Sequence, residues 1–288
     1  MADRYAVMGH PIAHSKSPFI HARFAAQTGQ ALVYQAIHVL PGDFARAVAQ
    51  FQAAGGQGLN ITLPFKEQAF ALADVRTRRA LEAEAVNTLW FDSAGRCYGD
   101  NTDGVGLIRD LCENHGMTLA GKRILLLGAG GAVRGVLGPL MAARPAIIIC
   151  ANRTLPRAEA LVARFASGNR LAASAFPALE GLAFDLIINA TSASLQGTVP
   201  PLPEGILKEG GWCYDLAYAD GPTAFVQWGF ARGASRSVDG LGMLVEQAAE
   251  SFYRWRGVRP ATAPVIAALR ASLGEPGAPV NDVHRPRR

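Results

Sequence analysis

The sequence predicts an α/β protein of two domains in which the second domain is inserted into the first, and three observations carry this prediction. Within the first hundred residues, strand-like and helix-like segments alternate in the order βαβαβ. A second alternating series begins at Asp103 and ends before Gly240. Two helical segments then follow, at residues 241–255 and 260–273, without a strand of their own. We therefore expect these helices to pack on the first domain.

Length and composition agree with this division. The chain has 288 residues, enough for two domains of roughly 100 to 200 residues each. Half of its residues are hydrophobic and 18% are charged, so it can bury a large core. We assign residues 1–103 with 240–273 to the first domain and 104–239 to the inserted domain. Residues 274–288 are rich in proline, glycine and charge, which predicts a disordered tail.

In the first domain we expect strands at residues 4–9, 31–39 and 59–63, with helices at 17–29 and 41–56 between them. The first helix should begin at Ser17, because Pro18 suits the first helical turn and the Ser17 hydroxyl can accept a bond from a free backbone N–H. Gly29 supplies its stop. This helix therefore starts directly at the polar segment HSKSP.

The inserted domain contains a glycine-rich turn of the kind that binds a dinucleotide. After a helix at 104–116, strands are expected at 123–128, 146–150, 184–190 and 211–217. Gly128, Gly130 and Gly131 follow the first of these strands and open a helix. Glycines there let the backbone approach a pyrophosphate, which the helix N-terminus then stabilises. The spacing is GxGGA, not the strict GxGxxG, but its position between strand and helix favours a Rossmann-type domain.

The residues after the next strand favour NADP over NAD. A Rossmann domain that binds NAD usually presents Asp or Glu there to the ribose hydroxyls. Here the chain has Asn152, Arg153 and Thr154, with Arg157 one turn further. A guanidinium can bind a 2′-phosphate through paired charge-assisted bonds, whereas a carboxylate would repel it. The alternative is that Arg153 is a solvated surface arginine.

Thr191 and Ser192 follow the predicted strand at 184–190, at the end where ligands of parallel sheets bind. They either line the cofactor or form a simple turn at the strand end.

Polar clusters in the first domain suit a polyhydroxy acid, and Lys66 stands out among them. The clusters are residues 14–17, 60–66, 85–88 and 101–103. Only four of the 28 basic residues are lysines, namely Lys16, Lys66, Lys122 and Lys208. Lysine, unlike arginine, can exchange its proton when its surroundings favour the neutral amine. We therefore interpret Lys66 as a proton carrier.

Asp103 and the later helix supply the remaining candidates in this region. A carboxylate beside Lys66 stabilises the ammonium form, so we interpret Lys66 and Asp103 as a coupled pair that shares a proton with a substrate oxygen. A structural salt bridge is the alternative. Met243 and Gln247 are four residues apart and share a helix face. They either reach the cleft, or Met243 is core and Gln247 is surface.

Charge and cysteine usage argue against other classes. The net charge of +5 comes without a long basic run, which favours anionic metabolites over nucleic acid. The cysteines, Cys97, Cys112, Cys150 and Cys213, form no CxxC pair, so neither a disulfide framework nor a thiolate metal site is expected. Histidines without an accompanying ligand cluster also predict no metal. The apolar stretches are far shorter than the ~20 residues of a membrane span, and the sequence shows no leader segment, so we expect a cytoplasmic protein.

Eight segments together carry a family resemblance. They are GHPIAHSKSP at 9–18, NITLPFK at 60–66, AVNT at 85–88, GDNTDG at 99–104, GAGGAVRG at 128–135, NRT at 152–154, NATS at 189–192 and GLGMLVEQA at 240–248. In this order they closely resemble the shikimate dehydrogenase family over nearly the whole chain. The chain departs from the family's usual pattern at two segments. In NATSASLQG the loop differs in sequence, which leaves its shape open, and in DLAYADGPTAF the proline is displaced to Pro222, which leaves the contacts of Tyr218 open.

The resemblance implies NADPH-dependent, reversible reduction of 3-dehydroshikimate to shikimate, on the route to chorismate and the aromatic amino acids. It implies that Lys66 and Asp103 are the catalytic pair. It implies substrate contacts from Ser15, Ser17, Thr62, Asn87 and Gln247, with Asn60 and Tyr218 nearby. It implies cofactor contacts from Gly128, Ala129, Gly130, Gly131, Ala132, Asn152, Arg153, Thr154, Arg157, Leu216, Gly240 and Met243.

Two other functions stay open at this point. A relative that accepts quinate, with or without NAD, differs in substrate and cofactor preference, although Arg153 argues against NAD. A regulatory protein that binds NADP without turnover would have no need of both Lys66 and Asp103. The sequence also leaves open whether the protein is a monomer or a homodimer.

Overall fold

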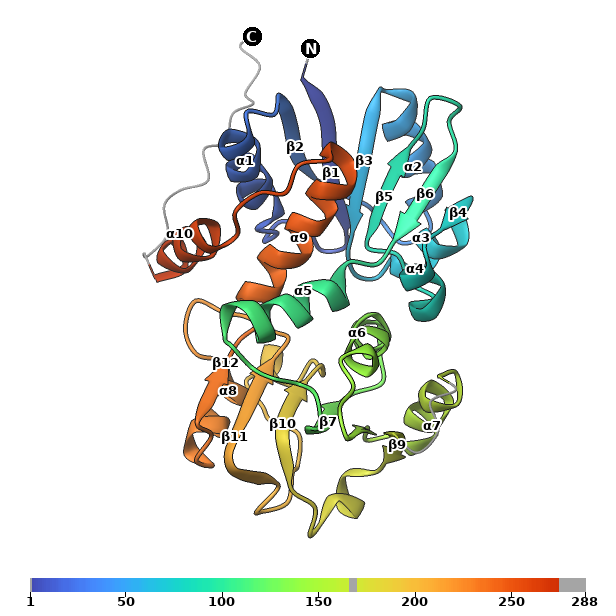
Figure 1. The fold of residues 1–288 in the computed structure, drawn as a ribbon. Helices are drawn as coiled ribbons and strands as arrows, with labels where there is room; N and C mark the ends of the chain where they lie inside the picture. Colours follow the sequence, from blue (N-terminus) through green and yellow to red (C-terminus); the bar gives the residue numbers. More distant parts are fainter. Residues whose placement is uncertain (1, 166–169, 275–288) are drawn as a thin grey trace.

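The computed structural model describes residues 2–165 and 170–274. It shows two lobes, each built on a six-stranded sheet, joined through the green helix α5 (Figure 1). The predicted class, an α/β protein with a Rossmann-type sheet beside a second α/β sheet, is confirmed. Most of the predicted tail, residues 275–288, lies outside the described residues, and Gly274 is the last residue of a helix.

The first sheet is mixed, with strand order β2-β1-β3-β5-β6-β4. Its parallel part contains the three predicted strands, β1 (Asp3–Gly9), β2 (Leu32–His38) and β3 (Gly56–Ile61). Its other part was not predicted and consists of three strands, β5 (Thr88–Phe91), β6 (Cys97–Asp100) and β4 (Val75–Arg76). Strand β5 is antiparallel to both β3 and β6, and β4 is parallel to β6. This second part brings the segment 100–103 next to the end of β3.

In the part of the chain that the structure describes, six α-helices belong to the first lobe. They are α1 (Ser17–Thr28), α2 (Phe44–Ala53), α3 (Lys66–Leu72), α4 (Arg78–Ala83), α9 (Leu241–Arg256) and α10 (Ala263–Gly274). Apolar side chains of α9 and α10 share a buried cluster with Ile20 and Phe24 of α1. The C-terminal helices therefore pack against α1 in the first lobe, as predicted, and Figure 1 shows them beside it.

The start of α1 differs in detail from the prediction. The N-cap is Lys16, without a side-chain cap, and Ser17 is already helical. The prediction that Ser17 accepts the capping bond is wrong, because the Ser17 N–H instead points to the hydroxyl of Ser15 at 3.3 Å. Gly29 ends the helix in the left-handed region with φ 63°, as expected.

The second sheet is parallel throughout, with strand order β12-β11-β10-β7-β8-β9. Its strands are β7 (Arg123–Leu127), β8 (Ile147–Ala151), β9 (Leu171–Ser174), β10 (Phe184–Asn189), β11 (Leu207–Asp215) and β12 (Arg236–Val238). Among the described residues, three α-helices accompany them, α6 (Gly131–Ala142), α7 (Leu155–Ala163) and α8 (Ala224–Ala231). The central strands are apolar on both faces, as parallel sheets require.

Helix α5 (Asp103–Arg109), which continues as a π-helix over Asp110–Asn114, lies where the two lobes meet. Two glycines allow its close packing. A Cβ on Gly106 would lie 2.8 Å from the carbonyl oxygen of Met243 in α9, and one on Gly104 would lie 2.5 Å from that of Gly135 in α6. Contact with both lobes holds α5 in place, and Asp103 is its first residue.

Three further observations concern the described part of the chain. No helix in it has the length and apolar character needed to cross a membrane. No three His, Cys, Asp or Glu side chains in residues 2–165 and 170–274 gather as metal ligands. The four cysteines are free thiols, and burial raises the pKa of Cys97, Cys150 and Cys213 to about 12, so these three stay protonated.

Candidate active site

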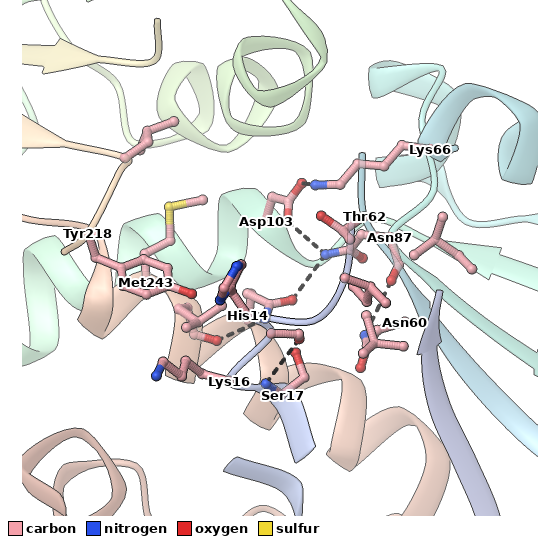
Figure 2. A pocket seen from close by; sticks show the side chains of 18 of the residues that line it. His14, Lys16, Ser17, Asn60, Thr62, Lys66, Asn87, Asp103, Tyr218 and Met243 are labelled. Carbon is pink, nitrogen blue, oxygen red and sulfur yellow. Dashed lines mark hydrogen bonds and ion pairs between the residues drawn. The ribbon is translucent and has the colours of Figure 1, made fainter. Parts of the chain in front are cut away.

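A cavity of about 380 Å³ lies where the two lobes meet, and it collects polar side chains from distant parts of the chain (Figure 2). Both residues of the predicted catalytic pair line it, and so does every predicted substrate-binding residue. These are Lys66, Asp103, Ser15, Ser17, Asn60, Thr62, Asn87, Tyr218 and Gln247. Their roles remain predictions, but the fold brings all of them to one place.

Lys66 and Asp103 form an ion pair in the wall of this cavity. Lys66 is the first residue of α3 and Asp103 the first residue of α5, so two helix starts meet here. The distance from Nζ to Oδ2 is 2.6 Å, and the side chains are 19% and 9% exposed. Figure 2 shows the two groups pointing at each other. A mostly buried ammonium and carboxylate in direct contact can exchange one proton with a ligand oxygen beside them.

Asn87 orients the second oxygen of Asp103. Its Nδ2 group donates to Asp103 Oδ1 at 2.7 Å and approaches Thr102 Oγ1 at 2.9 Å and Gln247 Oε1 at 3.2 Å. Its own Oδ1 accepts from the backbone N–H of Thr102 at 2.9 Å. The carboxylate is therefore held from both sides, by Lys66 on Oδ2 and by Asn87 on Oδ1, and cannot turn without breaking a charge-assisted bond.

Asn60, at the end of β3, is fixed from behind. Its Oδ1 accepts from the hydroxyl of Tyr34 at 2.7 Å, and its Nδ2 donates to Asn87 O at 3.2 Å and to Ser251 Oγ at 3.0 Å. Burial raises the pKa of Tyr34 well above its usual value, outweighing the opposite effect of Ser17, so the hydroxyl stays a neutral donor. Sequence reasoning missed Tyr34, since only tertiary structure connects β2 to Asn60.

The loop before α1 contributes more to the cavity than predicted. Besides Ser15 and Ser17, its residues His14 and Lys16 also line the cavity. They belong to the HSKSP segment, so their position in the sequence could have indicated them. The loop presents two hydroxyls, an imidazole and an ammonium toward one side of the cavity, a set that suits an anionic group with hydroxyl neighbours.

The side of the cavity nearest the parallel sheet is formed by residues that were predicted to touch the cofactor. Leu216 follows β11, Gly240 precedes α9, and Met243 lies in the first turn of α9. A side chain on Gly240 would collide with the carbonyl oxygen of Leu216, so glycine is required there. Tyr218 lines the same cavity, and burial raises the pKa of its hydroxyl.

The glycine-rich turn opens into a second cavity of about 330 Å³. Gly128 has φ 110°, and a Cβ there would lie 3.2 Å from Ala190 O. Gly130 is the N-cap of α6, and a Cβ on it would meet open space. Of the predicted cofactor residues, Ala129, Gly130, Gly131 and Arg157 line this cavity. Sequence reasoning missed three charged lining side chains, Glu67, Arg134 and Arg164.

The remaining predicted cofactor residues lie after strands along the same edge of the sheet or, for Ala132, in the first turn of α6, and neither cavity includes them. Gly128 and Ala132 flank the glycine turn, Asn152, Arg153 and Thr154 follow β8, and Thr191 and Ser192 follow β10. The Thr191 hydroxyl donates to Asn189 Oδ1 at 2.7 Å. Such a bond is typical of a turn at a strand end, which was the alternative interpretation of Thr191.

The donor set at this edge fits a dinucleotide with an extra phosphate. At its N-terminus α6 has free backbone N–H groups, next to glycines that leave space for a ligand. The guanidinium groups of Arg134, Arg157 and Arg164 line the adjoining cavity. In the segment after β8, residues 152–157, the side chains are neutral or basic, so no carboxylate there repels a phosphate.

A parallel dinucleotide-binding sheet, joined to a substrate lobe with a lysine–aspartate pair between them, defines a nicotinamide-dependent oxidoreductase. Family models agree: the shikimate dehydrogenase substrate binding domain matches residues 7–89, shikimate / quinate 5-dehydrogenase matches 110–197, and the shikimate 5'-dehydrogenase C-terminal domain matches 240–270. The chain belongs to the shikimate dehydrogenase family, which confirms the resemblance.

Individual relatives show how far the similarity extends. A shikimate dehydrogenase (NADP(+)) from Alkalilimnicola ehrlichii is 60% identical over 94% of this chain and 99% of its own. An Ael1 enzyme from Pseudomonas putida has a structure with TM-score 0.87 and 50% identity, covering 93% of this chain and 98% of its own. A shikimate 5-dehydrogenase from Thermus thermophilus, solved with NADP(H) and shikimate, has TM-score 0.84 and 34% identity, covering 94% and 99%.

Proposed function

We propose that this chain catalyses the reversible, NADPH-dependent reduction of 3-dehydroshikimate to shikimate, on the route to chorismate and the aromatic amino acids. The observation that carries the proposal is the Lys66–Asp103 ion pair, 2.6 Å apart, in a cavity rich in hydroxyls and amides next to the carboxyl ends of a parallel sheet. The curated NADP-dependent relatives, up to 60% identical over almost the full chain, support the same conclusion.

The substrate would be held by hydrogen bonds from both sides of the cavity. Ser15 and Ser17 supply hydroxyls for its carboxylate, while Thr62, Asn60, Asn87 and Gln247 supply partners for its ring oxygens, and Tyr218 adds a further hydroxyl. Asn60 and Asn87 already have fixed orientations, so the wall that they form is ordered before the substrate binds. Such prior ordering lowers the entropic cost of positioning the reacting carbon.

Proton transfer falls to Lys66. The bound cofactor supplies the hydride that reduces the ketone carbon. Lys66 Nζ donates a proton to the ketone oxygen, and in the oxidation direction the same nitrogen takes the hydroxyl proton back. Asp103 holds Nζ in place through Oδ2, while Asn87 prevents the carboxylate from rotating.

The cofactor would lie along the carboxyl ends of β7, β8, β10 and β11. Gly128, Ala129, Gly130, Gly131 and Ala132 would cradle its pyrophosphate, and Asn152, Arg153, Thr154 and Arg157 its adenosine 2′-phosphate. Thr191, Ser192, Leu216, Gly240 and Met243 would lie beside the nicotinamide. The open glycines at the start of α6 and the basic residues after β8 support this assignment.

We also propose residues 1–103 with 240–273 as the substrate-binding and catalytic domain, residues 104–239 as the cofactor domain, and the cytoplasm as the location. The two separate sheets and the packing of α9 on α1 support this division. Expression of residues 104–239 alone, followed by NADP titration, tests whether that part folds and binds cofactor by itself. Light scattering of the full chain distinguishes a monomer from a homodimer.

The deciding assay follows the absorbance of reduced nicotinamide with purified protein and each pairing of NADP or NAD with shikimate or quinate. Rapid reduction of NADP with shikimate is the expected result. A preference for quinate or NAD would instead assign the related quinate activity. Absence of turnover in all four mixtures, with NADP still bound, would leave a regulatory NADP-binding protein as the better description.

A further inference from the structure

Glu67 and Arg134 form an ion pair that joins the two lobes. Glu67 directly follows the proposed catalytic Lys66 in α3, whereas Arg134 lies in the first turn of α6, where its N–H bonds to Gly130 O at 3.2 Å. The pair therefore connects the helix that begins with the lysine to the helix that begins with the glycine-rich turn. Neither residue was predicted to contact substrate or cofactor, although both line the cavity beside the glycine turn.

The surroundings of Arg134 contain more positive than negative charge. The 330 Å³ cavity beside the glycine turn is lined by Arg134, Arg157 and Arg164, and by a single carboxylate, Glu67. Arg164 also pairs with Glu84 at 2.6 Å. Burial, and then the charge of Arg164, lowers the pKa of Arg134. Three guanidiniums around one small cavity thus have room for a further anion.

The two partners differ in exposure to water. The Arg134 side chain is 16% exposed and lines the cavity beside the glycine turn, whereas the Glu67 side chain is 68% exposed. An exposed carboxylate can move into water at little cost, since exposed ion pairs contribute little to stability. A phosphate carries more charge than a carboxylate and binds a guanidinium through two parallel bonds.

We propose that Arg134 binds a phosphate group of the dinucleotide and that Glu67 competes with that phosphate for the guanidinium. This inference rests on the proposed function, because it concerns the same cofactor. When the cofactor enters, Arg134 exchanges Glu67 for a phosphate, and the direct link between α3 and α6 is released. Glu67 then acts as an internal substitute for the phosphate in the cofactor-free chain, which limits cofactor affinity.

The test measures the dissociation constant of NADP by the fluorescence change of the protein on titration, without substrate. Arg134→Gln should weaken binding by about tenfold, the loss of one good guanidinium–phosphate contact. Glu67→Gln should strengthen binding by about threefold, because it frees Arg134 and removes a repelling charge. The double variant Arg134→Gln/Glu67→Gln should bind NADP as weakly as Arg134→Gln to within about twofold. Without the Arg134 guanidinium there is no group for which Glu67 and the phosphate compete, so removing Glu67 brings little further change.

Opposite signs for the two partners of one ion pair distinguish competition from a structural bridge. If the pair only joins the lobes, both single variants weaken binding or both leave it unchanged, and the inference is overturned. Arg134→Lys, which keeps the charge and loses the bidentate geometry, should fall between wild type and Arg134→Gln. Arg46→Gln is the matched control, since it breaks an exposed ion pair with Asp43 in α2.

Titration with NAD identifies which phosphate is bound. A loss confined to NADP in Arg134→Gln assigns the 2′-phosphate, and an equal loss for both cofactors assigns the pyrophosphate. Unchanged affinity for both overturns the inference. Failure of the wild-type chain to bind NADP would instead contradict the proposed function, so the two failures are separable.

Discussion

In the substrate cavity, polar side chains hold one another in place, whereas along the cofactor edge the backbone does most of the shaping. Lys66, Asp103, Asn87, Asn60 and Tyr34 form one connected series of hydrogen bonds between 2.6 and 3.2 Å. The glycine turn instead depends on residues without side chains and on a helix N-terminus. Removal of a single polar side chain should therefore impair turnover or shikimate binding specifically, whereas a change of charge should alter cofactor binding.

The largest expected effect comes from Lys66→Ala. Turnover should fall about a hundredfold or more while shikimate affinity stays broadly intact, because the variant removes the proton carrier and leaves the hydroxyls and amides of the cavity. Initial rates and equilibrium binding of shikimate together test this. Lys208→Ala, a lysine paired with Asp185 on the parallel sheet, is the control. A Lys66→Ala enzyme with ordinary turnover would remove the proposed role.

A buried histidine behind the substrate cavity should make this lobe sensitive to acid. His21 is fully buried, stacks on Tyr34 at 4.1 Å, and has no hydrogen bond on either ring nitrogen among the described residues. Burial lowers its pKa from 6.5 to about 3, against a smaller opposing effect of Asn60. The unfolded chain therefore binds this proton at a higher pH than the folded one, and stability falls as pH drops below 6.5 toward 3.

Urea unfolding at pH 7.5 and pH 5 measures this effect. The wild-type free energy of unfolding should fall by about 2 kcal/mol more than that of His21→Phe, which has no such proton to bind. His14→Gln, an exposed histidine in the same lobe, should lose as much as the wild type. Equal losses in wild type and His21→Phe would show that other groups dominate the acid sensitivity.

The cofactor side is tested by reversing a charge. Arg153→Asp should reduce the preference for NADP over NAD by at least about tenfold, because it removes a partner of the 2′-phosphate and adds repulsion. The ratio of kcat/KM for the two cofactors is the measurement, and the KM for shikimate should stay constant. An unchanged ratio would mean that Arg157, Arg134 or another group recognises the phosphate.

Local signals predicted the parts of the fold that depend on neighbours in sequence. The glycine turn, the stop of α1 and the four long strands β7, β8, β10 and β11 of the parallel sheet follow from short patterns, whereas its edge strands β9 and β12 were not predicted. The strands β5 and β6 escaped prediction because each has four residues, too few to show a period. The cap of α1 was misassigned by one residue, because the helix begins at Ser17 after Lys16, which caps it without a side-chain bond.

The same distinction applies to the site. Lys66 and Asp103 could be identified from composition and motif, because their chemistry is visible in their residue types. Tyr34 and Arg134 could not, because each acquires its importance from a partner far away in the chain. Tyr34 meets Asn60 only when β2 and β3 flank β1, and Arg134 meets Glu67 only when the lobes come together. Sequence patterns indicate the chemical groups of a site, whereas the residues that orient those groups become visible only in the tertiary structure.

The smallest effect expected is that of Tyr34→Phe, and it separates positioning from folding. The variant keeps the ring that stacks on His21 but removes the donor to Asn60 Oδ1. Asn60 then loses a fixed orientation, and the KM for shikimate should rise about fivefold, equivalent to roughly 1 kcal/mol for one hydrogen bond. The KM for NADP and the value of kcat should change by less than about twofold.

A purely structural role for Tyr34 would lower the unfolding midpoint and leave the shikimate KM unchanged. Tyr253→Phe, which removes a hydroxyl from a tyrosine that is 40% exposed on α9, controls for the substitution itself. A rise in the KM for shikimate alone would show that the substrate cavity depends on side chains behind its wall. If the KM for NADP rose equally, the two sides of the site would be coupled, and the contrast between them would have to be abandoned.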